Sequence, residues 1–282
     1  MTDPLHPAKP RPGDKVAVLS PSSGLPGLLP LPYELGLRRL REEFGLKPVE
    51  YLLLFLRNAG IVGYHGGSVM VELGRPGALH PLTADSLRAA LFTSGEYELT
   101  AADAFGDVNR PWEDPRTFES EPELETAGGW IWHNGGRVVE GIGWGGNLEI
   151  ISWLLMADRA VLPADAYAGN VLFLETSEET PPAEQVYRIL RNMGERGLLR
   201  QFPALLMGRA KAWSFENPLS GPERDVFRLR QREAVLRALR QYAPDTMAVF
   251  DVDLGHTDPQ LVLPVGGRIR VDGREHRITV TY

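Results

Sequence analysis

The chain has 282 residues, of which 43% are apolar and 24% are charged, so it can bury one large core or two smaller ones. Its net charge of −7 argues against nucleic acid or an anionic membrane as the main partner, because both require a basic surface. The absence of cysteine excludes disulfides and a cysteine nucleophile. Residues 1–10 lack the apolar stretch of a signal peptide, and no later segment reaches the length of a membrane span. We therefore expect a cytoplasmic protein.

The first 95 residues have the pattern of an α/β domain. Apolar runs and helical spacing predict, in chain order, a strand at 15–19, a helix at 34–44, a strand at 46–51, a strand and turn at 61–68, and a helix at 83–92. Thr83 resembles the cap of the last helix. The order of these elements is that of a βαβ unit.

One junction in this domain breaks the pattern. Tyr51 runs directly into residues 52–60, which look like the end of a buried helix. No loop and no Ser, Thr, Asp or Asn cap precedes that helix, although its first backbone N–H groups need partners. We infer that a segment is missing between Glu50 and Leu52.

The rest of the chain divides into a linker and a second domain. Residues 96–136 are acidic and rich in tryptophan, which predicts a crossover linker made of loops. Residues 137–282 are predicted to form a strand-rich α/β domain that begins with a Gly-rich loop. It continues with a helix at 149–156, a strand ending at Glu175, a helix at 183–193, strands at 204–208 and 247–252, and a hairpin at 268–271 and 276–281 around Asp272-Gly273. The arginine-rich stretch 224–240 is interpreted as an amphipathic helix with a solvated basic face.

Two residues have the placement of catalytic groups. Glu175 closes the apolar strand Val171-Leu-Phe-Leu-Glu175, and His256 lies in the turn Asp253-Leu-Gly-His256-Thr-Asp258. Loops at strand ends hold reacting groups on a rigid scaffold, so the pair is predicted to be an orienting acid and a general base. Glu175 as a buried structural carboxylate remains the alternative.

Several motifs in the same order carry a family resemblance. They are the opening Pro12-Gly-Asp14-Lys-Val-Ala-Val-Leu-Ser20, Gly145-Gly-Asn147-Leu, the Glu175 strand, and Phe250-Asp-Val-Asp-Leu-Gly-His256. Together they resemble the LD-carboxypeptidase family of serine peptidases, and the Trp-rich insertion is more similar to its microcin C self-immunity (MccF-like) branch. The resemblance implies a flavodoxin-like N-terminal domain with a parallel sheet, a Ser-Glu-His triad containing Glu175 and His256, no cofactor, and a cytoplasmic homodimer.

The chain departs from this family at the nucleophile. The resemblance implies a Gly-Tyr-Ser-Asp elbow just before a helix like 52–58, and that elbow is absent at the junction identified above. Ser22 and Ser68 lie in loops without a nucleophile-elbow pattern, so each is more simply a turn or capping hydroxyl. Either a segment of the natural protein is missing from this chain, or the chain is a catalytically silent homologue.

The remaining candidates concern the ligand. Trp144 and Asn147 are predicted to bind substrate, since a flat aromatic face can stack on a nucleobase; packing at a domain interface is the alternative for Trp144. His65 is more simply a packed histidine than a base. No metal site is predicted, because the six histidines have no metal-ligand spacing.

The expected function is hydrolysis of an amide or acyl-phosphoramidate bond in an aminoacyl-nucleotide or peptidyl substrate. Two alternatives remain open. One is a silent homologue that binds such ligands, and the other is an LD-carboxypeptidase that acts on murein tetrapeptide. All three take a small molecule or short peptide as the partner.

Overall fold

The structure of the protein is a computed structural model, which describes residues 8–18, 29–50, 62–158 and 161–282. The α-helices are α2 (Pro30–Glu42), α3 (Pro81–Phe92), α4 (Leu148–Ala157), α5 (Ala183–Glu195) and α6 (Gly221–Tyr242), with short 3₁₀ helices at Pro115–Glu119, Ala164–Tyr167 and Leu199–Gln201. The strands of the first half are β1 (Lys15–Val18), β2 (Lys47–Glu50), β3 (Gly63–His65), β4 (Glu96–Leu99), β5 (Ala104–Phe105), β6 (Glu125–Thr126) and β7 (Ile131–His133). Those of the second half are β8 (Val138–Asn147), β9 (Val171–Glu175), β10 (Ala204–Gly208), β11 (Met247–Val252), β12 (Leu263–Val265), β13 (Arg268–Asp272) and β14 (Arg277–Thr281).

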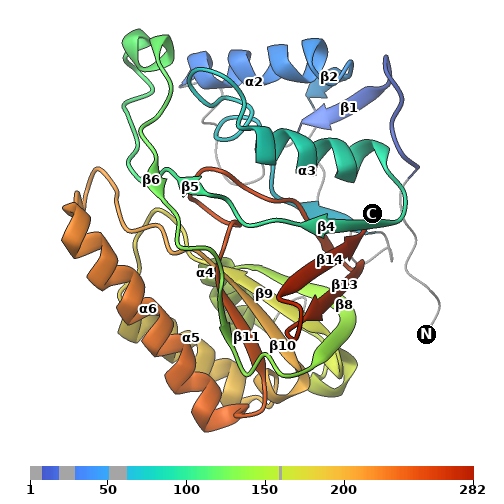
Figure 1. The fold of residues 1–282 in the computed structure, drawn as a ribbon, viewed down its shortest axis with the longest axis vertical. Coiled ribbons are helices and arrows are strands. Elements are labelled where there is room, and N and C mark those ends of the chain that lie inside the picture. Colours follow the sequence, from blue (N-terminus) through green and yellow to red (C-terminus); the bar gives the residue numbers. More distant parts are fainter. Residues whose placement is uncertain (1–7, 19–28, 51–61, 159–160) are drawn as a thin grey trace.

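An eight-stranded mixed sheet organises the molecule (Figure 1), and its strand order is β4-β14-β13-β8-β9-β10-β11-β7. The four strands β8 to β11 are parallel, whereas β4, β14 and β13 on one side and β7 on the other add antiparallel pairs. Strand β8 links the two parts, since its first half pairs with β13 and its second half with β9. The predicted α/β class is confirmed, but the longer run of parallel strands lies in the second half of the chain, whereas the described N-terminal part, for which the parallel sheet was predicted, contains the parallel pair β1 and β2.

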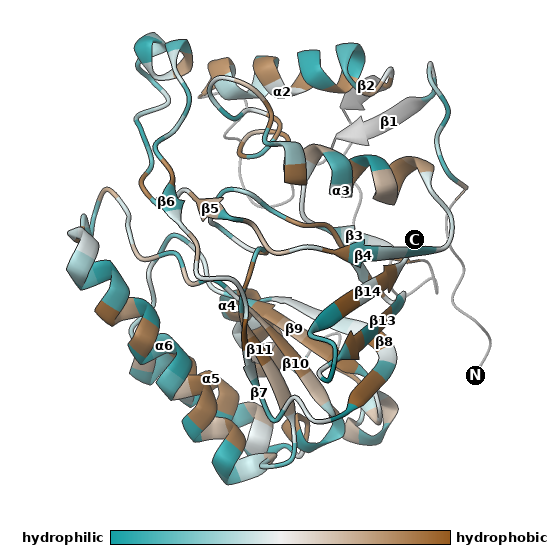
Figure 2. Ribbon diagram, in the orientation of Figure 1, coloured by the Kyte–Doolittle hydropathy of each residue, from teal (hydrophilic) through white to brown (hydrophobic). Residues whose placement is uncertain are grey.

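The sheet is covered on both faces by apolar residues, which belong to two separate core clusters. One cluster joins the sheet to α4, α5 and α6 through residues such as Leu172, Leu155, Leu190 and Val235. Figure 2 shows that the central strands are hydrophobic, while α5 and α6 have hydrophilic and hydrophobic residues alternating along them. This contrast is the pattern of amphipathic helices that bury one stripe against a sheet.

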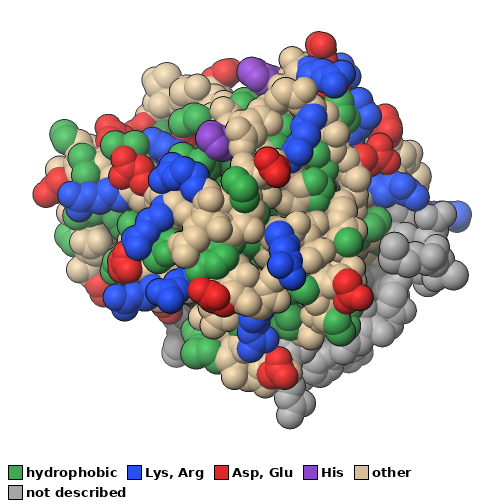
Figure 3. Space-filling model, turned by 90° about the horizontal axis from the view of Figure 1, so that it is seen from below, with side chains coloured by type: hydrophobic (Ala, Val, Ile, Leu, Met, Phe, Trp, Pro, Cys, Tyr) green, Lys and Arg blue, Asp and Glu red, His purple; other side chains and the backbone are tan. Residues whose placement is uncertain are grey.

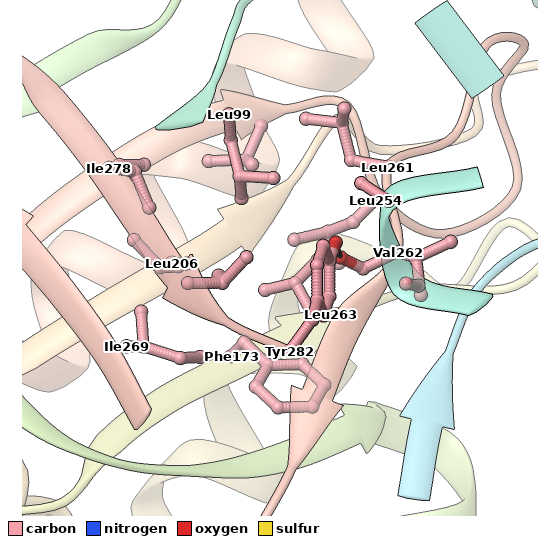
Figure 4. Packing of buried hydrophobic residues seen from close by; sticks show 14 of the residues in the cluster. Leu99, Phe173, Leu206, Leu254, Leu261, Val262, Leu263, Ile269, Ile278 and Tyr282 are labelled. Carbon is pink, nitrogen blue, oxygen red and sulfur yellow. Dashed lines mark hydrogen bonds between the residues drawn. The ribbon is translucent and has the colours of Figure 1, made fainter. Parts of the chain in front are cut away.

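The second cluster lies on the other face and includes the N-terminal elements. Phe173 and Leu206 from the parallel strands meet Ile269 and Ile278 from the terminal strands and Tyr282 at the C-terminus (Figure 4). Residues of α2 and α3, among them Leu40 and Leu87, belong to the same cluster. Apolar burial therefore joins residues 1–95 to the later part of the chain, and the division into domains 1–95, 96–136 and 137–282 stays a prediction.

Several predicted elements agree with the structure and others do not. The strands at 204–208 and 247–252 and the terminal hairpin are confirmed. The expected Gly-rich loop is wrong, because these residues form the end of strand β8. The linker of loops is wrong in part, since β4 and β7 are strands of the main sheet and β5 pairs with β6.

The predicted cap of α3 is also wrong. The helix begins at Pro81, and the Nδ1 atom of His80 accepts a hydrogen bond from the backbone N–H of Leu82 at 3.2 Å. Thr83 lies inside the helix, where its buried hydroxyl accepts a hydrogen bond from the backbone N–H of Gln260 at 3.0 Å. The threonine thus joins α3 to the chain segment after His256.

The N-terminal elements before α3 form a smaller layer. Strands β1 and β2 pair in parallel, as predicted for a βαβ unit, and α2 connects them. The predicted helix at 52–58, the junction between Glu50 and Leu52, and the candidate Ser22 lie outside the described residues. No helix in the described part of the chain has the length and apolar character needed to cross a membrane.

The basic helix α6 departs from the expectation of a solvated basic face. The buried Arg228 pairs with Asp107, and Arg232 Nη1 lies 2.9 Å from the Asp251 carboxylate. Arg237, by contrast, has a side chain that is 54% exposed. Part of the arginine content therefore balances acidic groups inside the protein. Acidic and basic side chains are also interspersed over the face shown in Figure 3.

Candidate active site

The carboxyl ends of β8 and β9 bring the first two candidate residues together. Asn147 is the last residue of β8, Glu175 is the last of β9, and the two are paired in register. In α/β sheets, ligands bind beyond the carboxyl ends of parallel strands, at the point where connections leave for opposite faces. The fold therefore places Asn147 and Glu175 at the usual edge for a site.

Close backbone packing at this edge depends on glycine. Gly145 has φ +148°, and a Cβ atom there would lie 1.7 Å from the carbonyl oxygen of Phe173. Only glycine permits this approach of β8 to β9. The Gly-Gly-Asn motif thus sets the distance between the strands that carry the site.

His256 is held against Glu175 by the turn that follows β11. The Nδ1 atom of His256 lies 2.7 Å from Oε2 of Glu175, although the two residues are 81 positions apart. Glu175 is 1% exposed, whereas the His256 side chain is 35% exposed. A buried carboxylate that orients a partly exposed imidazole is the arrangement of an acid–base pair. The structure brings these two predicted residues into direct contact.

A third residue, Glu178, completes the group and was not predicted. Its Oε2 atom lies 3.0 Å from Nε2 of His256, on the side of the ring opposite Glu175. Glu178 follows the end of β9 by three residues, and its side chain is 58% exposed. The only clue in the sequence was its position just after a candidate catalytic strand end.

The two carboxylates control the charge of the imidazole. Burial by itself would lower the pKa of His256, but the hydrogen bonds from the ring to Glu175 and Glu178 outweigh burial and raise the pKa to about 10. The same contact with His256 lowers the pKa of Glu178 to about 2. Burial would raise the pKa of Glu175, yet the contact with His256 keeps it below its usual value. At neutral pH the site therefore contains an imidazolium between two carboxylates.

His65 lies beside this group. Its ring centroid is 5.7 Å from that of Phe173, and burial lowers the pKa of His65, with a smaller opposing effect from Glu175. A neutral, packed imidazole is what such an environment favours. The contacts of His65 thus match the packed histidine expected from the sequence, next to the site rather than within its hydrogen-bonded chain.

Comparison with known proteins places this geometry in a family. Residues 140–271, which contain Asn147, Glu175 and His256, match the family model of the LD-carboxypeptidase C-terminal domain. The predicted resemblance is confirmed, and no curated protein matches the chain in sequence.

Solved structures extend the likeness to nearly the whole chain. An MccF-like protein from Streptococcus pneumoniae in complex with AMP has a TM-score of 0.81 at 18% identity, over 96% of this chain and 99% of that one. The microcin C7 self-immunity protein MccF in complex with aspartyl sulfamoyl adenosine has a TM-score of 0.78 at 17% identity, over 99% of both chains. An MccF-like protein from Bacillus anthracis str. Ames has a TM-score of 0.75 at 15% identity, over 99% and 100%. The chain therefore has the MccF-like fold.

Within the matched segment, Asn147 has a positioning role. Its Oδ1 atom accepts a hydrogen bond from the backbone N–H of Ile150 at 2.9 Å and so caps α4. Its amide also makes the smallest of the contributions that lower the pKa of Glu175, after those of His256 and His65. Its predicted contact with substrate stays a prediction.

Trp144 is placed differently from its neighbour in the motif. It is 4% exposed, and its ring lies 4.9 Å from Tyr167 and 5.7 Å from Phe202, centroid to centroid. These contacts put the indole in the core that joins the sheet to the helices. They support packing, the alternative weighed from the sequence, and they leave no exposed indole face for stacking on a nucleobase in this conformation.

Ser68 has the contacts of a turn residue. Its hydroxyl accepts a hydrogen bond from the backbone N–H of Val71 at 3.2 Å, and its own N–H donates to the Glu72 carboxylate at 2.7 Å. Burial raises the pKa of Glu72 to about 7 in spite of that hydrogen bond. Capping, the simpler interpretation of Ser68, is the role these contacts support.

The aspartates around His256 are paired with arginines. Asp251 pairs with Arg232, Asp253 with Arg209 and Asp258 with Arg75, at 2.9, 3.0 and 2.7 Å respectively. Their charges are thus balanced by cations of the protein itself. Among the residues that the structure describes, no group of three or more His, Asp and Glu side chains has the arrangement of a metal site.

Proposed function

We propose that the protein is a serine-peptidase-like hydrolase that cleaves an amide or acyl-phosphoramidate bond of an aminoacyl-nucleotide or peptidyl substrate. The observation that carries the proposal is the 2.7 Å contact between Glu175 Oε2 and His256 Nδ1. It occurs at the carboxyl edge of the sheet, within the segment that matches the LD-carboxypeptidase C-terminal domain.

Each group of this pair has a defined task in acyl transfer. Glu175 holds the Nδ1–H tautomer of His256, so Nε2 becomes the position that takes a proton from a serine hydroxyl. The serine then attacks the carbonyl carbon, and the imidazolium returns the proton to the leaving amine. Water hydrolyses the acyl-enzyme by the same route. The serine has to come from a nucleophile elbow, which this sequence does not contain.

The substrate class follows from relatives of the same fold. The complexes of those relatives contain AMP, aspartyl sulfamoyl adenosine and glutamyl sulfamoyl guanosine, all built on a nucleoside. We extend to this chain the expectation that its substrate is an aminoacyl nucleotide. We also propose that the protein acts as a homodimer. Murein tetrapeptide is the competing substrate, and direct comparison of the two in one assay separates them.

A second function, binding without turnover, has an observation of its own. Glu178 lies against Nε2 of His256, where a nucleophilic serine would have to be. A chain without the elbow but with an intact pocket would sequester its ligand and protect it from other enzymes.

The intact mass of the protein purified from its natural source tests whether a segment that could contain the nucleophile elbow is present. A mass several kilodaltons above the 31.2 kDa of this chain would indicate an additional segment and favour the hydrolase. A mass that matches 31.2 kDa would favour binding without turnover.

An assay for turnover then decides between the two functions. We expect the His256→Ala variant not to cleave an aminoacyl adenosine phosphoramidate, with the products measured by mass spectrometry. Cleavage that His256→Ala leaves unchanged would refute the proposed mechanism. Saturable binding without product would establish the second function instead.

A further inference from the structure

We infer that Glu178 is an internal ligand of the site: its carboxylate occupies the catalytic nitrogen of His256 and keeps the imidazole from acting as a base. The inference deepens the proposed function and rests on it, because it assigns the same site a residue that controls when the base is available.

The proton positions follow from the two contacts alone. An ionised carboxylate only accepts hydrogen bonds, so carboxylate oxygens 2.7 Å from Nδ1 and 3.0 Å from Nε2 favour the form of His256 in which both ring nitrogens carry a proton. An imidazole that donates from both nitrogens is an imidazolium and has no lone pair with which to take a proton. In the observed arrangement His256 therefore cannot act as a general base.

The backbone holds Glu178 in place. Glu149, a buried residue of α4, accepts hydrogen bonds from the backbone N–H of Ser177 at 2.9 Å and from its hydroxyl at 2.8 Å. The turn that carries Glu178 is thereby tied to the helix that begins beside Asn147. The backbone position of Glu178 beside His256 is thus set by the contacts of the preceding residue.

The side chain itself is free to leave. Glu178 is 58% exposed, in contrast to 2% for the side chain of Glu175, so its carboxylate can exchange the imidazole for water by rotation. Exposed ion pairs contribute little to stability, which makes such a movement accessible. Departure of Glu178 removes one of the two anions that keep His256 protonated.

Other charged groups near the pair act in known directions. His65 faces the same group, and its own ionisation is opposed by His256. Lys211 is close enough to Glu178 to lower the pKa of that carboxyl slightly, although the lysine ammonium donates a hydrogen bond to Asn109 Oδ1 at 2.8 Å. Neither His65 nor Lys211 touches Nε2 of His256. The substitution that tests the inference is therefore made at Glu178.

The test is an NMR titration of the ring nitrogens of His256, assigned with a His256→Gln variant. In the Glu178→Gln variant we expect the pKa of His256 to fall by at least about one unit, because a neutral amide replaces one carboxylate. The control is Glu179→Gln, which removes the same charge one residue later from another exposed side chain. In this control the pKa of His256 should stay within about 0.3 units of the wild-type value.

Two results would overturn the inference. One is a pKa of His256 that is the same in Glu178→Gln as in the wild type, and the other is an equal fall in Glu179→Gln, which would mean a general charge effect. The titration needs no ligand, so it decides the role of Glu178 independently of any activity.

Binding of aspartyl sulfamoyl adenosine, measured by calorimetry, tests the proposed function separately. We expect Glu178→Gln to bind about fivefold more tightly than the wild type and Glu179→Gln to bind equally, because the ligand no longer displaces an ion pair. Equal affinity in all three would contradict displacement of Glu178. Absence of binding in all three proteins would reject the proposed ligand class. The NMR titration would still test the contact between Glu178 and His256, because it needs no ligand.

Discussion

Asn147 and Glu175 lie opposite each other at the ends of two adjacent parallel strands, and the amide of Asn147 caps α4 while it contributes to the lowered pKa of the buried carboxylate. One side chain therefore stabilises a helix and orients a site residue at once. Its two functions can be separated by substitution.

Replacement of Asn147 by alanine removes the cap of α4 and the polar amide that helps to lower the pKa of Glu175. We expect a loss of about 1 kcal/mol in the free energy of unfolding, measured by urea denaturation, and a rise in the pKa of Glu175. Asn147→Ser is the matched control, since serine also caps a helix but is too short to reach the carboxylate. Restored stability together with a raised Glu175 pKa is the expected result for serine. A pKa of Glu175 that equals the wild-type value in both variants would show that Asn147 has no influence on the site.

The imidazolium makes stability depend on pH. The folded pKa of His256, about 10, lies above its ordinary value of 6.5, so its contribution is fully present below pH 6.5 and is lost as the pH rises toward 10. Because the side chain is partly exposed, solvent screening reduces this contribution to about 1 kcal/mol, or a few degrees in Tm. Thermal melts between pH 6 and pH 10 should show the loss in the wild type and not in His256→Gln. Parallel curves for both proteins would contradict the assignment.

The buried Asp107 is expected to be important for stability. Its side chain has no solvent exposure, accepts a hydrogen bond from the backbone N–H of Ala212 at 3.1 Å and lies among the cations Lys211, Arg224 and Arg228. Removal of this buried anion leaves Arg224 and Arg228 with the more exposed carboxylates of Glu125 and Asp225 as partners, so Asp107→Asn should cost about 3 kcal/mol in the free energy of unfolding.

A control for this variant is Asp85→Asn, which breaks the exposed pair with Arg88, in which Asp85 is 68% exposed. Denaturant curves of this control should overlay those of the wild type. An Asp107→Asn protein as stable as the Asp85→Asn protein would mean that the cations find water or other acceptors.

The turn before His256 requires glycine for reasons of space. Gly255 has φ +98°, and a Cβ atom there would lie 2.7 Å from Cβ of Glu175 and 2.9 Å from its Oε2. Gly255→Ala should therefore push Glu175 away from His256 and lower the pKa of the imidazole, measured by NMR. Gly266→Ala is the control, because Gly266 has φ +85° and nothing within 4 Å of its Cβ position. The control should lose stability through backbone strain but keep the His256 pKa; if both variants shift it equally, the steric argument fails.

Much of the second half of the chain could be predicted from its sequence. Strands such as 204–208 and 247–252 are apolar runs bounded by turn residues, and their bounds agree with the structure. The short strands β4 and β7 could not be predicted, because they are stabilised by pairing with β14 and β11, far away in sequence. Local propensity contains no information about such partners.

The site was predictable in part for the same reason. Glu175 and His256 follow recognisable local patterns, but the contact of Glu178 with the ring depends on a turn fixed by Glu149. Likewise, the inward direction of Arg228 depends on Asp107, 121 residues away. Charge patterns along a helix give the period of its faces, whereas the partner of each face is a tertiary property.

The alternation of side chains along β9 decides to which side of the protein the carboxylate belongs. Val171 and Phe173 face one core cluster, whereas Leu172 and Leu174 face the other, so Glu175 shares its side with Phe173. An odd number of inserted or deleted residues in this strand would exchange the two sides and turn the carboxylate toward the helices. The side of the sheet to which the carboxylate belongs therefore depends on the number of residues in β9 and not on which apolar residues precede Glu175.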